Sequence, residues 1–134
     1  MNRRKARRLA LSLSFGAQFQ KDTPAQELLA DFTENGGESD EYVKELYLGV
    51  SERSDELDGY ISGFLKGWKL ERISKMTLAI LRLTVYEILY TDTPDSVAAN
   101  EAVELAKEYA ESGSASFVNG VIANVIKNKA SETV

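Results

Sequence analysis

Residues 74–91 form the most apolar segment of the chain, with hydrophobic side chains on nearly every face of the helix that their spacing predicts. A helix of this kind has to be covered by other helices on several sides. Arg82 and Glu87 interrupt the apolar run, which makes it too short and too charged to span a bilayer. The segment therefore predicts the central, buried helix of an all-α fold.

Amphipathic helices are predicted on both sides of this segment. Apolar residues recur at steps of three and four within residues 3–20, before Asn35-Gly36-Gly37, from about Ser39 to Leu65, after Pro94 and after Ser116. The sequence shows no alternating strand pattern and no internal repeat. We predict a boundary at Trp68, which divides the chain into helical subdomains 1–67 and 68–134.

Three helix ends can be predicted from local residue types. Thr23 is expected to cap a helix that starts at Pro24, and Ser39 is expected to cap the next one. On the helix predicted after Pro94, the side chain of Tyr109 is expected to point inward, toward the core. The polar tail from Asn128 is expected to fray.

Charge is distributed very unevenly along the chain. Residues 1–21 hold six cations and no acid, whereas residues 22–60 hold twelve acids and two cations. A local basic cluster can hold a polyanion even when the rest of the chain repels it. The arginine-rich start, residues 3–8, together with Phe15 and Phe19, suits single-stranded RNA, where phosphate contacts combine with base stacking. A solvated, frayed terminus is the alternative interpretation.

The composition leaves little room for catalysis or metal binding. The sequence contains no Cys and no His, so the thiolate and imidazole ligands and the commonest general base are absent from it. Glu101, Glu104 and Asp95 make a weak carboxylate set for a hard metal ion. We therefore expect a cytoplasmic binding protein that is not an enzyme, has no cofactor or metal and does not span a membrane.

Arg82 needs a carboxylate partner if its helix is buried, because a lone buried guanidinium is costly. Glu87, Glu101 and Glu104 are the candidate partners. We predict a structural ion pair between two helices, formed from Arg82, Glu87 and Glu101.

Three sequence blocks follow one another in the C-terminal half. They are residues 80–87 (ILRLTVYE), residues 100–107 (NEAVELAK) and residues 117–121 (FVNGV). These blocks resemble the LR-x-x-x-YE, NEA-[IV]-ELAK and FVNG-[VI] motifs of the NusB (N-utilisation substance B) family. The start of the chain, residues 3–7, is similar to that family's R-R-x-x-R start. The resemblance covers essentially the whole chain and is loosest over residues 22–60.

The resemblance implies an all-α fold of about seven helices, arranged as two packed three-helix subdomains. It also implies a transcription antitermination factor that binds single-stranded boxA RNA jointly with a small ribosomal-subunit protein, NusE. Such a complex helps RNA polymerase read through terminators, especially in ribosomal RNA operons. A protein-interaction adaptor without RNA specificity is the alternative. The sequence leaves open whether the chain is a monomer or a homodimer.

The resemblance also assigns roles to individual positions. RNA contacts are expected at Arg3, Arg4, Arg7, Phe117 and Asn119, and partner contacts at Phe15, Met76, Thr77 and Ile80. Ser116 stands where the family frequently has Lys, and Thr77 stands where it frequently has an acid. We expect the basic first helix to fold back beside the last one, so that the two form a single surface for a polyanion.

Overall fold

The computed structural model describes residues 1–132, which contain seven α-helices, one short 3-10 turn and no strand. The helices are α1 (Arg3–Ala17), α2 (Ala25–Glu34), α3 (Glu41–Glu52), α4 (Ser54–Ser62), α5 (Lys75–Tyr90), α6 (Asp95–Tyr109) and α7 (Ser114–Glu132), and the 3-10 turn is η1 (Leu70–Arg72). The predicted all-α fold is therefore confirmed. None of the described helices is long and apolar enough to cross a membrane.

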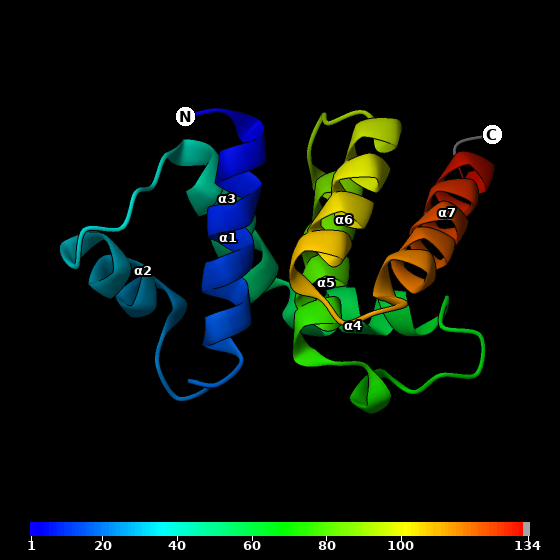
Figure 1. Ribbon diagram of the computed structural model, residues 1–134, viewed down its shortest axis with the longest axis horizontal. Coiled ribbons are helices and arrows are strands. Elements are labelled where there is room, and N and C mark those ends of the chain that lie inside the picture. Colours follow the sequence, from blue (N-terminus) through cyan, green and yellow to red (C-terminus); the bar gives the residue numbers. More distant parts are fainter. Residues whose placement is uncertain (133–134) are drawn as a thin grey trace.

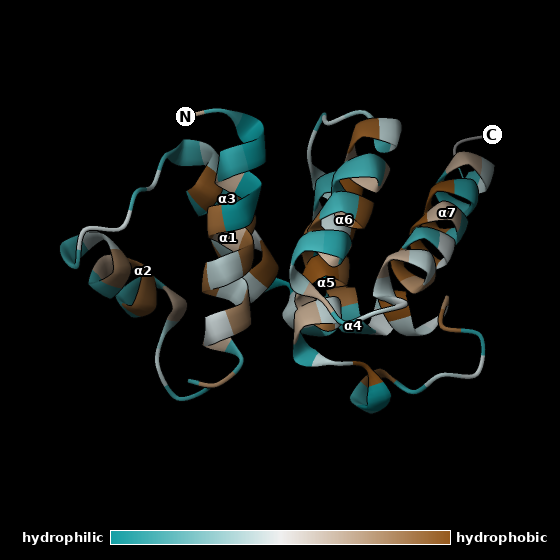
Figure 2. Ribbon diagram, in the orientation of Figure 1, coloured by the Kyte–Doolittle hydropathy of each residue, from teal (hydrophilic) through white to brown (hydrophobic). Residues whose placement is uncertain are grey.

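Helix α5 lies at the centre of the molecule. It packs against α1, α3, α4, α6 and α7, and most of its side chains are buried. Ser74 caps its N-terminus by accepting a hydrogen bond from the backbone N–H of Thr77 at 3.2 Å. Figure 2 shows hydrophobic residues along α5 where α6 lies beside it. The apolar run at residues 74–91 thus forms the central helix that its composition predicts.

The remaining helices cover α5 from two flanks (Figure 1). On one flank α1 and α3 pack against each other and α5, and α2 lies outside them. On the other flank α6 and α7 pack against each other and α5. The division at Trp68 stays a prediction, because α5 contacts helices of both halves and the buried residues form one continuous core.

The helix caps near residues 23 and 39 differ from the prediction. Helix α2 begins after Pro24 without any side-chain cap, so Thr23 is not its N-cap. Asp40 caps α3 in place of Ser39, and its carboxylate accepts the N–H of Val43 at 2.8 Å. A carboxylate has the advantage there, because its charge also interacts favourably with the helix dipole.

Three further expectations were wrong as well. The single helix predicted from 39 to 65 is divided at Arg53, whose φ of −111° and ψ of 17° separate α3 from α4. Tyr109 is 44% exposed and does not point inward. Helix α7 continues past Asn128, because the Asn128 amide donates to the Tyr60 hydroxyl at 3.3 Å and to Glu132 at 3.1 Å.

Gly49 permits the close approach of α3 to α5. A Cβ atom added at Gly49 would lie 2.3 Å from Cζ of the Tyr86 ring, whereas one added at Gly59 of α4 would meet nothing within 4 Å. The absence of a side chain at Gly49 is therefore a packing requirement.

We predict that Gly49→Ala lowers the free energy of unfolding by about 1–3 kcal/mol, since the Tyr86 ring has to move. Gly59→Ala is the matched control and should raise that free energy by up to about 1 kcal/mol, because alanine favours an exposed helix. Urea denaturation followed by circular dichroism measures both. Equal stability of the two variants would contradict the close packing of α3 on α5.

Candidate nucleic-acid interface

Arg7 of α1 is buried and forms an ion pair with Glu87 of α5. Its Nε lies 2.8 and 3.0 Å from the two carboxylate oxygens, and the two side chains are only 6% and 2% exposed. Hydroxyls of Tyr42 and Thr93 also donate to Glu87. Burial would lower the pKa of Arg7, but the hydrogen bond and charge of Glu87 raise it above its usual value. Arg7 therefore joins helices and does not present its guanidinium to RNA.

The other cations at the start of α1 lie at the surface, and most have partners within the chain. Arg4 pairs with Glu101 at 2.9 Å, Lys5 with Glu38 at 2.8 Å and Arg8 with Glu108 at 2.6 Å. The Arg3 guanidinium lies 3.6 Å above the ring of Tyr42. The Arg4 side chain remains 61% exposed although Glu101 is only 12% exposed, so the guanidinium of Arg4 can still be reached by a phosphate.

The expected joint surface of the first and last helices is not formed. Helix α1 packs against α2, α3 and α5, whereas α7 packs against α5 and α6. Figure 1 shows α5 and α6 between α1 and α7. The prediction was wrong because the apolar α5 needs cover on both flanks, which places the first and last helices on opposite sides of it.

Arg82 pairs with Asp58 of α4 and not with the predicted acids. Its Nε and Nη2 each lie 2.7 Å from one oxygen of that carboxylate. An ion pair between two helices is therefore present, but Glu87 belongs to Arg7 and Glu101 to Arg4. Glu87 follows Arg82 by five residues, so the two side chains leave α5 on different faces.

The weak carboxylate set considered as a metal site does not come together. Glu104 lies 3.7 Å from Lys107, and Asp95 lies 2.9 Å from Lys129. Within residues 1–132 there is no group of three or more acids that could hold a metal ion.

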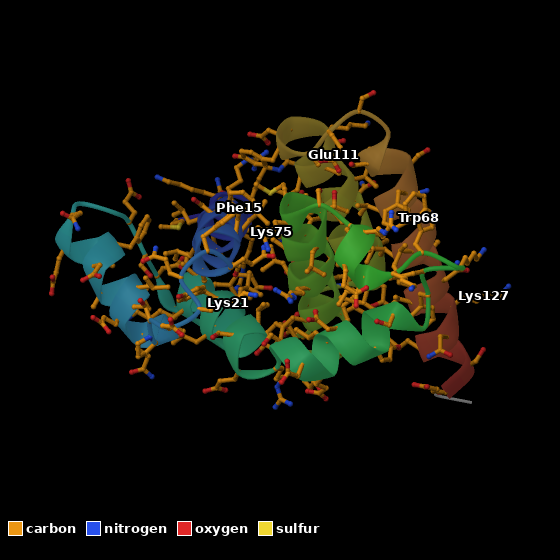
Figure 3. The ribbon with its side chains drawn as sticks, turned by 90° about the horizontal axis from the view of Figure 1, so that it is seen from below. Phe15, Lys21, Trp68, Lys75, Glu111 and Lys127 are labelled. Atoms are coloured by element: carbon orange, nitrogen blue, oxygen red, sulfur yellow. The ribbon has the colours of Figure 1, made fainter. Side chains whose placement is uncertain are left out.

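The four expected partner contacts differ in accessibility. Thr77 is 2% exposed and Ile80 is completely buried, so neither offers its side chain to another protein in this structure. Phe15 and Met76 are half-buried. Phe15 stacks edge-to-face on Phe19, with ring centroids 5.2 Å apart, and Figure 3 shows Phe15 and Lys75 on the same side of the molecule. Phe15 and Met76 stay predictions as partner contacts.

The segment between α4 and α5 carries a basic and aromatic surface that the sequence analysis treated only as a boundary. Within residues 1–132 the structure gives Lys66, Lys69 and Arg72 no carboxylate partner. Trp68 is 60% exposed, and its ring meets Phe117 of α7 edge-to-face at a centroid distance of 6.2 Å. Alternation of cations with an aromatic residue in KGWKLER was the signal that could have revealed this surface.

Glu111, in the turn before α7, is held by hydroxyl groups of three residues. Its Oε1 accepts hydrogen bonds from Ser114 at 2.6 Å, Ser74 at 2.9 Å and Thr77 at 3.0 Å. The bond from Ser114, supported by those from Ser74 and Thr77, holds the pKa of Glu111 below its usual value. The hydroxyl of Thr77 thus points inward and fastens α5 to the α6–α7 turn.

The fold and its surface define a class: a small all-helical protein with cationic and aromatic side chains exposed at two separate places. The sequence matches the NusB family over residues 4–127, and the chain belongs to that family. Its resemblance to known members extends over nearly its whole length.

Three known proteins illustrate the similarity. The transcription antitermination protein NusB of Acetivibrio thermocellus is 44% identical over 135 residues, which cover 96% of this chain and 91% of that protein. T. maritima NusB has the same fold, with a TM-score of 0.84, 31% identity and coverage of 95% of this chain and 92% of that one. A crystal structure of the antitermination factors NusB and NusE in complex with dsRNA matches with a TM-score of 0.80, 25% identity and coverage of 94% and 96%.

We predict that Arg7→Met lowers the free energy of unfolding by about 3–5 kcal/mol, because it leaves the carboxylate of Glu87 buried without its cation. Lys5→Met removes the ion pair with Glu38, in which both side chains are at least half exposed, and should change that free energy far less, because an exposed ion pair contributes little to stability. Urea denaturation of both variants compares the two directly. A similar, small effect of both substitutions would show that Arg7 does not hold α1 against α5.

Glu111 should make stability depend on pH in acid. Because its pKa is lowered by folding, its contribution is present above the unfolded value of 4.5 and is lost as the pH falls through the lower folded value. The difference in thermal stability between wild type and Glu111→Gln should therefore shrink as the pH is lowered. A difference that stays constant in a series of melting curves would contradict the assignment.

Proposed function

We propose that the chain is an RNA-binding transcription antitermination factor. It would bind boxA-type single-stranded RNA together with a ribosomal protein that acts as NusE, and the complex would help RNA polymerase read through terminators. The observation that carries this proposal is the similarity over nearly the whole chain to transcription antitermination proteins, one of which is similar in fold and was solved with NusE and dsRNA. We also infer a cytoplasmic protein that acts by binding and not by catalysis.

We propose that the RNA binds at side chains of two helix starts. Arg3 and Arg4 lie at the start of α1, and Phe117 and Asn119 lie in the first turns of α7, with Asn119 exposed. Figure 1 shows these two helix starts at opposite edges of the molecule. An extended single strand can reach both places, and the unpaired cations of residues 66–72 provide further phosphate contacts beside α7.

We predict that the double substitution Arg3→Ala and Arg4→Ala weakens the binding of boxA RNA several-fold. Loss of two phosphate contacts should also reduce the slope of log K against log salt by about 1.4, since fewer counterions are released from a single strand. Filter binding over a series of salt concentrations measures both quantities. Lys44→Ala on α3 is the control and should leave the affinity and the slope unchanged.

The alternative is an adaptor that binds a protein partner without RNA specificity. The acidic surface of residues 22–60 favours that role, because it repels a polyanion. In that case the ribosomal partner would bind tightly, while boxA RNA and a scrambled RNA of the same length would bind equally weakly. An unchanged affinity and salt slope in the double variant would remove Arg3 and Arg4 from the RNA interface.

A further inference from the structure

The cavity beside Trp68 combines the three chemical features that recognise a nucleotide. It has a volume of about 350 Å³, and Trp68, Phe117, Arg72 and Glu111 contribute to its lining. We propose that this cavity binds one base of a single-stranded RNA and selects guanine through Glu111. The inference rests on the proposed function, and it adds residues and a base preference to it.

Trp68 provides an open stacking surface. Its side chain is 60% exposed, although tryptophan is largely buried in most proteins. Lys66 and Gly67 both have positive φ, 49° and 91°, and the resulting turn is closed by the backbone N–H of Trp68, which donates to Leu65 at 3.1 Å. Phe117 supports the indole from the side. An unpaired base can stack on such a ring whatever its identity, so stacking supplies affinity without selection.

Glu111 supplies the selection. All three hydroxyl donors bind its Oε1, so Oε2 is the oxygen that can accept hydrogen bonds from a ligand. A fixed carboxylate next to RNA repels phosphates and accepts hydrogen bonds from ribose hydroxyls and from N–H donors of a base, and only the N–H donors differ between bases. Guanine presents N1–H and its 2-amino group side by side on the Watson–Crick edge, which no other standard base does. A charged acceptor therefore favours guanine.

Arg72 completes the site. It belongs to η1, lies at the surface and has no carboxylate partner within residues 1–132. A free guanidinium beside a base pocket is suited to the phosphate of the same or the next nucleotide, which it can bind with two hydrogen bonds. Figure 3 shows Trp68 and Glu111 on the part of the molecule where α7 begins, and Arg72 lines the same cavity.

Trp68 is the single tryptophan of the chain, so its fluorescence reports directly on the cavity. The full chain is titrated with the hexaribonucleotide UUUGUU and with four versions that carry inosine, adenine, cytosine or uracil in place of guanine. We expect guanine to quench the emission at the lowest concentration. Inosine, which lacks the 2-amino group, should bind about tenfold more weakly.

Variants separate selection from affinity. Glu111→Gln should abolish the preference for guanine over inosine and leave the affinity for the all-uracil oligonucleotide unchanged. Arg72→Gln should weaken all five oligonucleotides by a similar factor. Ser114→Ala keeps the carboxylate but removes one of the three hydroxyls that hold its Oε1, so it should reduce the preference for guanine less than Glu111→Gln does. Glu104→Gln on α6 is a matched surface control.

Three outcomes would overturn the inference. In the first outcome, boxA RNA binds without changing the emission of Trp68, and Glu111→Gln ranks the five oligonucleotides as the wild type does. The cavity is then no base site, and the proposed function stands. If no RNA binds at all, both fail. If only the ribosomal partner changes the emission of Trp68, the cavity belongs to a protein interface.

Discussion

The buried ion pair between Arg7 and Glu87 determines how the first helix sits on the rest of the molecule. Two desolvated charges are stable only when their remaining hydrogen-bonding capacity is filled. Here the additional hydrogen-bond donors to Glu87 come from other segments, because Tyr42 belongs to α3 and Thr93 to the turn before α6. Four segments therefore meet at a single carboxylate, and α1 cannot rotate about its axis without exposing a buried charge to an apolar surrounding.

This constraint decides what the basic start of the chain can do. With Arg7 turned inward, Arg4 and Arg8 face α6, where they form ion pairs with Glu101 and Glu108. A phosphate that binds Arg4 has to share or replace its contact with Glu101, whereas Arg3 has no carboxylate partner among the ion pairs of residues 1–132. Among the ion pairs of residues 1–132, the cations between α4 and α5 have no carboxylate partner either. Some of the cations that are clustered at the start of the sequence therefore form ion pairs within the protein, whereas others stay accessible to a ligand.

Helical periodicity predicted the helices well because it depends on local side-chain spacing. The buried faces of α5 and α7 follow from it directly. Contacts between helices could not be predicted in the same way. The partner of Arg82 depends on which helix covers its face of α5, and nothing in the spacing of Glu87 identifies Asp58. The local pattern KGWKLER could have indicated the basic and aromatic surface at Trp68, but not its contact with Phe117, which lies far away in the sequence.

Position 77 shows how a substituted position can keep its local chemistry. The family resemblance leads us to expect an acid there, and this chain has Thr77, whose hydroxyl donates to Glu111 of the α6–α7 turn. A carboxylate is therefore again present beside the start of α5, but it is supplied by another segment. Because three hydroxyls hold one of its oxygens, this carboxylate is fixed in direction, and the other oxygen is oriented before any ligand arrives. An acceptor fixed in this way loses little side-chain entropy on binding, which is the physical basis of selectivity at a site that is otherwise built from stacking and charge.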